Sequence, residues 1–178
     1  TQGYPYSQQA SFPSQLKRRL DLIYPDRSIE VINLGASAVN SYTLLDILPE
    51  VLEESPDLIV IYAGHNEYYG ALGPASSKAI SPTLARTILF LRDYRIVQLI
   101  ESLISKFSVS KAAAGENLMQ TMIGQSFIEY ESSTYHKGIN QLDINLSSMI
   151  RMIKEAKVPV IIGTLSSNIG DHRPFNSD

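Results

Sequence analysis

The chain has 178 residues, the length of about one domain, and it has no cysteine, which excludes disulfide bonds, cysteine nucleophiles and thiolate metal sites. Its net charge of −3 and its pI near 5.6 argue against a nucleic-acid-binding surface, because such a surface needs clustered positive charge. With 44% hydrophobic residues the chain can build a core, and no apolar run approaches the roughly 20 residues that span a bilayer.

The N-terminal part of the chain predicts one helix followed by one strand. Ser11 can cap a helix that has Pro13 in its first turn, and Pro25 ends the run of apolar residues at helical spacing. The run SIEVINL over residues 28–34 is short and rich in β-branched residues. It therefore predicts a strand, which Gly35 closes.

A second helix and a second strand follow. Apolar residues recur at helical spacing over 44–52, and Pro49 should kink or restart that helix because proline lacks an N–H. Residues 58–63 are apolar almost without alternation. This pattern is typical of a strand that is covered on both faces.

Residues 71–131 interrupt the alternation and are expected to form a helical insert. Within it, Leu84 to Phe107 predicts an unusually apolar helix. Such a helix suits burial on more than one side, and it would also suit a lid, a membrane surface or a partner's groove. A further helix is predicted from about Asn117 to Tyr130.

The last part of the chain predicts a long helix and a third strand. From Ser133 onward one helical face is apolar, and residues 158–164 then form a buried strand pattern. Strands that alternate with helices predict a single α/β domain over 1–178 with an open, mainly parallel sheet. Ligands of such sheets bind at the carboxyl ends of the strands.

Glycine and polar residues gather at these predicted strand ends. Gly35 follows the first strand and offers an unobstructed N–H, and Asn66 follows the second strand and offers a carboxamide donor. Two such donors aimed at one developing negative charge would form an oxyanion hole, the arrangement used in acyl transfer. The alternative from the residues alone is that Gly35, Gly64 and Asn66 are ordinary turn residues.

Three segments of the sequence resemble the SGNH (GDSL-type) hydrolase superfamily, namely NLGASAVN at 33–40, IYAGHNE at 61–67 and VIIGTLSSN at 160–168. The first matches the segment that supplies the family's glycine donor, here Gly35. The second matches the segment that supplies its asparagine donor, here Asn66, and Glu67 stands where the family usually has aspartate. Residues 1–10 are similar to the sequence just downstream of the nucleophile in a bacterial, often membrane-anchored subgroup.

The resemblance implies a three-layer, flavodoxin-like parallel sheet with helices on both faces. The family's catalytic serine lies in a Gly-x-Ser segment on the first strand, and its histidine follows an aspartate by three residues. That first strand is expected to precede Thr1, no Asp-x-x-His occurs in the sequence, and Asp171 and His172 are adjacent. We therefore expect an interior fragment that lacks the first strand and the C-terminal end. Ser37 and Thr1 are alternative nucleophiles, but Ser37 lacks the Gly-x-Ser-x-Gly elbow and Thr1 would need a processed terminus.

The function implied by the resemblance is serine-dependent ester hydrolysis, with the nucleophile and base outside this chain. Gly35 N–H and the Asn66 side chain would hold the oxyanion. The expected substrate is a small-molecule, glycan or lipid ester, and no cofactor, metal or nucleic acid is expected. The subgroup points to the cell envelope, periplasm or exterior, near a membrane. The alternative function is a non-catalytic α/β module of the same fold that contacts a partner or a membrane surface.

Three further residues at predicted strand ends are candidate substrate contacts: His65, Glu67 and Asn168. Each has a second interpretation. His65 would also fit a solvated turn, Glu67 a structural hydrogen bond at the strand end, and Asn168 an Asx-capped loop. His65 and Glu67, with Asp171 and His172, lack the close helical pairing of a zinc motif, so they do not predict a metal site.

Overall fold

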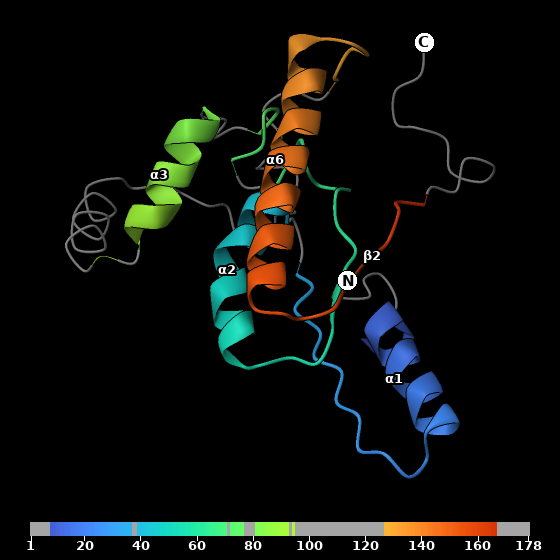
Figure 1. Cartoon of the computed structure of the whole chain (residues 1–178). Helices are drawn as coiled ribbons and strands as arrows, with labels where there is room; N and C mark the ends of the chain where they lie inside the picture. Colours follow the sequence, from blue (N-terminus) through green and yellow to red (C-terminus); the bar gives the residue numbers. More distant parts are fainter. Residues whose placement is uncertain are drawn as a thin grey trace, which may run out of the picture. The chain divides into compact units, whose positions relative to one another are not determined.

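The chain divides into two units, Thr1–Val39 and Asn40–Asp178, and each is described by itself. This computed structural model describes residues 8–36, 39–70, 72–76, 81–92, 94 and 127–166. The elements in chain order are η1 Gln8–Ala10, α1 Phe12–Ile23, α2 Ser41–Glu53, β1 Ile59–Ile61, α3 Pro82–Arg92, α6 Ser133–Glu155 and β2 Val160–Ile162 (Figure 1).

The first unit contains η1, α1 and an extended tail. α1 begins after Ser11 and has Pro13 in its first turn, as predicted. The side chain of Ser11 does not cap the helix, however, and its Oγ is hydrogen-bonded to Oγ of Ser14 at 3.0 Å.

The strand predicted over residues 28–34 is wrong, because the structure contains no strand in residues 28–36. The side chains still alternate, with Ile29, Val31 and Asn33 less exposed than the residues between them. A strand is defined by hydrogen bonds to a neighbouring strand. The described part of this unit offers a helix but no second strand, so the alternating pattern is present without the ladder.

The second unit is built on two parallel strands. β1 pairs with β2 in a register that places Ile59 opposite Val160. Gly163 extends the pairing by donating its N–H to the Ile61 carbonyl at 2.9 Å. Both strands lie inside segments predicted from the sequence, and their parallel pairing agrees with a mixed α/β architecture. The three-layer, flavodoxin-like arrangement stays a prediction.

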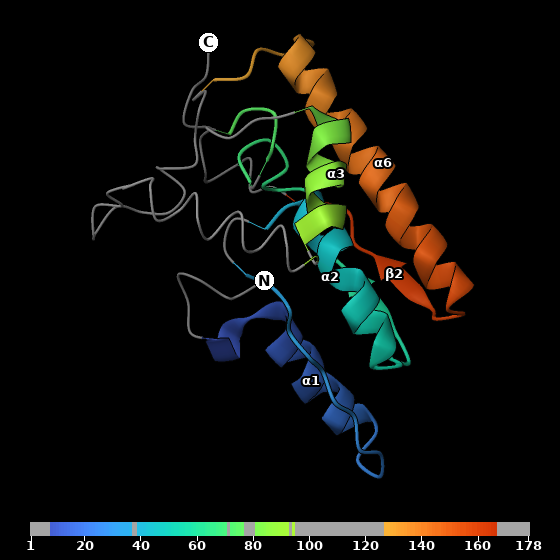
Figure 2. The same ribbon diagram turned by 90° about the vertical axis from the view of Figure 1, so that its left-hand side faces the viewer.

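Helices α2 and α6 lie side by side and pack over the same face of the two strands (Figures 1 and 2). The core between them is formed by Leu48 of α2, Ile61 of β1, and Met149 and Ile153 of α6. Full burial of one such aliphatic side chain contributes about 1.5–3 kcal/mol. This small core therefore fixes both helices to the sheet.

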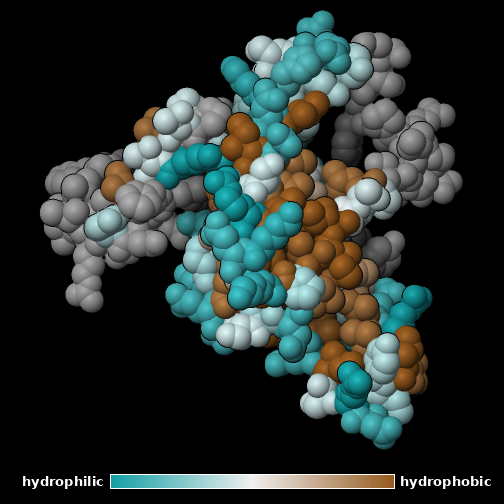
Figure 3. Space-filling view, in the orientation of Figure 1, coloured by the Kyte–Doolittle hydropathy of each residue, from teal (hydrophilic) through white to brown (hydrophobic). Residues whose placement is uncertain are grey.

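The opposite face of the strands is exposed in the described structure. Val60 and Ile161 lie opposite each other in the pairing of β1 with β2, and they are 39% and 55% exposed. Figure 3 shows apolar side chains gathered beside the polar outer face of α6. The described helices of this unit thus cover one face of the sheet, and helices on both faces stay a prediction.

α2 is a single helix that continues through Pro49, where a kink or a restart was predicted. Proline at this position removes one intrahelical hydrogen bond, because it has no N–H. The start of the helix is secured by Asn40, whose side chain accepts a hydrogen bond from the Thr43 N–H at 3.4 Å. A cap of this kind contributes about 1 kcal/mol.

The predicted insert is described only in part. α3 covers the first part of the helix predicted over 84–107, and the rest of that helix lies outside the described residues. The helix predicted over 117–130 lies mostly outside them too, and residues 127–130 are not helical. None of the described helices is both long enough and apolar enough to cross a membrane.

The predicted apolar face of α6 is confirmed in the C-terminal half of the helix, where Met149 and Ile153 are buried. In the N-terminal half, Ile139 is 45% exposed, and the buried side chains are those of Gln141 and Asn145. The buried stripe of α6 is therefore apolar toward the sheet and polar toward the turn that follows β1.

Gly138 on α6 packs against an aromatic ring of that turn. A Cβ at Gly138 would overlap the ring of Tyr68. This ring is stacked on Tyr135, and its hydroxyl donates to the Tyr135 carbonyl at 3.1 Å. Because the ring is held by both contacts, it cannot swing aside without losing them.

Replacement of Gly138 by Ala should therefore lower the free energy of unfolding by about 1–3 kcal/mol, because overpacking outweighs the gain in helix propensity of up to about 1 kcal/mol. Equilibrium urea unfolding measures the change. In a Tyr68→Ala background the same substitution should raise stability, since only the propensity gain remains. An equal loss in both backgrounds would contradict the ring contact as its cause.

Candidate functional site

The turn after β1 lies at the carboxyl edge of the sheet, next to the end of β2. Because the two strands are parallel, residues 64–67 and 163–166 share this edge. Tyr62 links the two ends, since its hydroxyl is hydrogen-bonded to Oγ of Ser166 at 3.1 Å. The ring of His65 lies edge-on against the ring of Tyr62, with centroids 5.2 Å apart.

Gly64 is required where this turn begins. Its φ is +131°, a conformation that other residues rarely adopt. A Cβ at this position would also lie 2.8 Å from Cδ1 of Leu165. Gly64 therefore lets the turn pass close to the end of β2.

Glu67, the last residue of the segment GHNE, is buried, with a relative exposure of 2%. One carboxylate oxygen accepts the Ser41 N–H at 3.0 Å. The other accepts the Ser41 hydroxyl and the Gln141 amide, each at 2.5 Å. Ser41 is the first residue of α2, so the negative charge also lies at the favourable end of that helix's dipole. These donors explain how a carboxylate can be buried here.

The hydrogen bonds continue from Ser41 to α3. Asn145 of α6 donates its amide to Oγ of Ser41 at 2.8 Å, and Arg86 of α3 donates to Oδ1 of Asn145 at 2.8 Å. One connected polar network, formed by Ser41, Glu67, Arg86, Gln141 and Asn145, thus joins three helices to the turn after β1.

Four members of this network were not predicted from the sequence, namely Ser41, Arg86, Gln141 and Asn145. A signal for two of them was present. Gln141 and Asn145 are four residues apart and continue the spacing of Met149 and Ile153, which marks them as buried polar residues. No comparable pattern marks Ser41 or Arg86.

Tyr42, next to Ser41 on α2, is 2% exposed. Burial raises the pKa of its hydroxyl above the ordinary 10.0, the nearby Arg86 charge lowers it, and the Glu67 charge raises it. Burial likewise raises the pKa of Tyr68. Both hydroxyls therefore stay neutral at neutral pH and remain able to donate a hydrogen bond.

The three predicted site residues of the turn after β1 differ in their surroundings. His65 is exposed, Asn66 is partly buried, and Glu67 is buried. The Asn66 carbonyl accepts the Gly70 N–H at 2.7 Å, which fixes the backbone of the turn. A substrate contact by Glu67 stays a prediction, and in the structure its oxygens are bonded to Ser41 and Gln141.

Gly35 belongs to the first unit, where its N–H donates to Oδ1 of Asn33 at 2.9 Å. Asn168 lies outside the described residues, as do Ser37 and the Asp171–His172 pair. Within the described ranges, no group of three His, Asp or Glu side chains is placed to hold a metal ion.

Replacement of Glu67 by Gln should lower the free energy of unfolding by about 1–3 kcal/mol, because an amide cannot accept all the hydrogen bonds that the carboxylate accepts. The free energy can be obtained from urea unfolding at neutral pH. Glu50→Gln is a matched control, since Glu50 is exposed on α2. Equal stability of the two variants would contradict a structural role of the Glu67 carboxylate.

The raised pKa of Tyr42 predicts a loss of stability at alkaline pH. In the unfolded chain the Tyr42 hydroxyl ionises near pH 10.0, whereas in the folded chain it keeps its proton to a higher pH. The proton therefore contributes its full stabilisation below pH 10.0, and this stabilisation is lost as pH rises through the folded pKa. Tyr42→Phe should therefore lose less stability between about pH 9 and pH 11, measured by urea unfolding. Tyr130→Phe, at a position that is 75% exposed, should behave like the unmodified protein. Identical pH profiles for Tyr42→Phe and the unmodified protein would contradict this assignment.

No model of a protein family matches the chain, and neither a curated protein nor a solved structure matches it. The resemblance to SGNH hydrolases therefore stays a prediction from the sequence segments quoted above.

Proposed function

We propose that the chain carries the oxyanion-binding part of a serine-dependent ester hydrolase of the SGNH type. The observation that carries this proposal is the position of the turn with Asn66 at the carboxyl edge of a parallel sheet, anchored by the buried Glu67. Open α/β sheets bind their ligands at this edge. An anchored turn fixes the backbone of Asn66 before substrate arrives, and the proposal uses the Asn66 carboxamide as the preorganised donor.

Gly35 is the second donor in this proposal. Its N–H already holds an oxygen acceptor, Oδ1 of Asn33, at 2.9 Å, within the range at which oxyanion-hole donors hold a substrate oxygen. During the reaction the substrate oxygen replaces Asn33 as the acceptor.

In the proposed reaction a serine that lies outside residues 1–178 attacks the acyl carbon of an ester. A histidine, also outside this range, takes the serine proton and later gives it to the leaving alcohol. The negative charge on the carbonyl oxygen is received by the Gly35 N–H and the Asn66 amide. His65 is exposed beside Asn66 and contacts the part of the glycan, lipid or small-molecule ester that extends from the sheet edge.

A second candidate function is a non-catalytic module that contacts a partner or a membrane surface. One observation favours it. Leu84, Ile88 and Leu91 lie at i, i+4 and i+7 on α3 and are 49%, 37% and 39% exposed, so they form an apolar stripe on this helix. The hydrolase assay below distinguishes the two functions.

Hydrolysis of p-nitrophenyl acetate by the protein whose chain continues upstream into the expected Gly-x-Ser segment tests the proposal. Asn66→Ala should lower kcat about a hundredfold or more, because one oxyanion donor is lost. Asn140→Ala, on an exposed position of α6, is the matched control and should retain full activity. Equal rates for both variants would remove Asn66 from the mechanism, and absence of hydrolysis would favour the binding module.

A further inference from the structure

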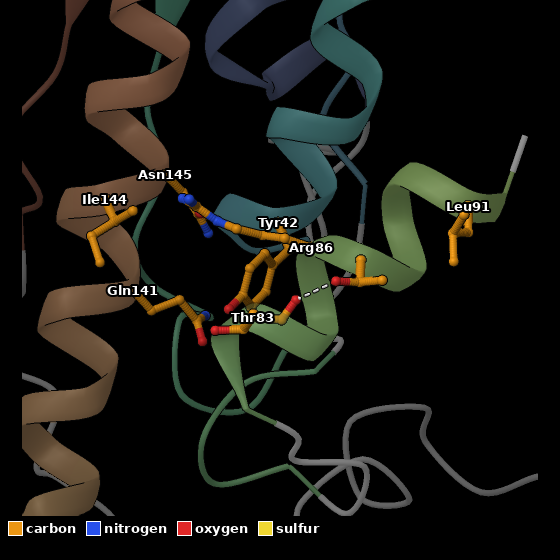
Figure 4. A pocket seen from close by; sticks show the side chains of 8 residues that line it. Tyr42, Thr83, Arg86, Leu91, Gln141, Ile144 and Asn145 are labelled. Carbon is orange, nitrogen blue, oxygen red and sulfur yellow. Dashed lines mark hydrogen bonds between the residues drawn. The ribbon is translucent and has the colours of Figure 1, made fainter.

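A cleft of about 660 Å³ lies between α2, α3 and α6 (Figure 4). Its volume is within the range of about 300–1,000 Å³ that is usual for small-molecule sites. Neither His65 nor Asn66 lines it. An inference about its ligand is therefore independent of the ester hydrolysis proposed above.

Arg86 supplies a fixed positive charge in the wall of this cleft. Its guanidinium donates to Oδ1 of Asn145, whose own amide is held by Ser41, so the orientation of Arg86 is set from the protein side. Among the described residues, no carboxylate forms an ion pair with Arg86. A guanidinium has five N–H donors, and a carboxylate or a phosphate can accept two of them at once.

Tyr42 places a second donor in the same cleft. Figure 4 shows its side chain between those of Gln141 and Arg86, with the hydroxyl toward the start of α3. The hydroxyl is a neutral donor at physiological pH, since burial raises its pKa. Thr83 adds a hydroxyl from the first turn of α3. The polar part of the cleft thus presents donors from two helices to one ligand group.

The rest of the cleft is apolar. Leu91 of α3 and Ile144 of α6 line it and are 39% and 45% exposed, so each has apolar surface available for contact. Covering such surface stabilises a complex by about 25 cal/mol per Å². A small inorganic anion would leave this apolar surface exposed to water. A neutral apolar molecule would displace water from the Arg86 guanidinium without replacing the hydrogen bonds that the water made.

We propose that this cleft binds an amphipathic oxyanion, in which a carboxylate or phosphate head contacts Arg86 and Tyr42 and a short apolar chain lies against Leu91 and Ile144. The head balances the positive charge of Arg86, and the chain covers the apolar wall of the cleft. Two simple probes represent the two head groups, octanoate and octyl phosphate.

Isothermal titration of the intact protein with these probes tests the proposal. At least one of octanoate and octyl phosphate should bind about tenfold or more tightly than octanol, which has the same chain without charge. The tighter of the two identifies the head group. Octyltrimethylammonium should not bind, because its charge repels Arg86. Equal affinities for octanol and both anions would overturn the proposal, and so would absence of binding by both anions.

Substitutions assign the binding to this cleft. Arg86→Gln should weaken binding of the anion about tenfold or more. Arg151→Gln, at an exposed position of α6 outside the cleft, is the matched control and should bind normally.

Arg86→Gln could weaken binding by unfolding the protein, because Arg86 belongs to the polar network. A second pair of variants, at Ile144, leaves this network intact. Ile144 is partly exposed at the cleft wall, so both charged replacements should fold. Both variants lose the apolar contact of Ile144 and differ in the sign of the charge, so the anion should bind Ile144→Lys more tightly than Ile144→Glu. Equal affinities of these two variants for the anion would overturn the placement of its head in this cleft.

Discussion

The buried carboxylate of Glu67 is the interaction on which the second unit depends. Removing a carboxylate from water costs several kcal/mol unless hydrogen bonds replace its solvation. Here the replacement comes from the first residue of α2 and from Gln141 of α6. Displacing either helix would remove some of these donors and leave the buried charge incompletely hydrogen-bonded. The start of α2, the rotation of α6 and the path of the turn after β1 are therefore determined together, by one side chain.

Two glycines make this arrangement sterically feasible. Gly64 allows the turn to leave β1 against Leu165, and Gly138 allows Tyr68 to lie on α6 three residues before Gln141. Both close approaches draw the turn toward β2 and α6, and this brings Glu67 within reach of Gln141. The hydrogen bonds of Glu67 and the two glycines, Gly64 and Gly138, therefore depend on each other. Asn66 lies between Gly64 and Glu67, and both of these residues are held in place.

The sequence predicts local structure well where one periodic pattern decides it. β1, β2, α1 and the C-terminal half of α6 follow from the spacing of apolar residues. The strand over 28–34 fails because alternation does not reveal whether a partner strand is available. The partners of Glu67 could not be predicted for a similar reason: Ser41 and Gln141 are 26 and 74 residues away along the chain, and only the fold brings them together. Glu67 was a candidate for a strand-end hydrogen bond, but its donors were not identifiable.

The order of groups in the polar network decides which of its charges is available to a ligand. A direct ion pair between Glu67 and Arg86 would neutralise both side chains and leave little attraction for a third group. Instead, Ser41 and Asn145 lie between them, so Glu67 is satisfied by neutral donors and Arg86 is held by a neutral acceptor. An amide acceptor orients a guanidinium without cancelling its charge. The network therefore stabilises the turn at one end and leaves a positioned cation in the cleft at the other.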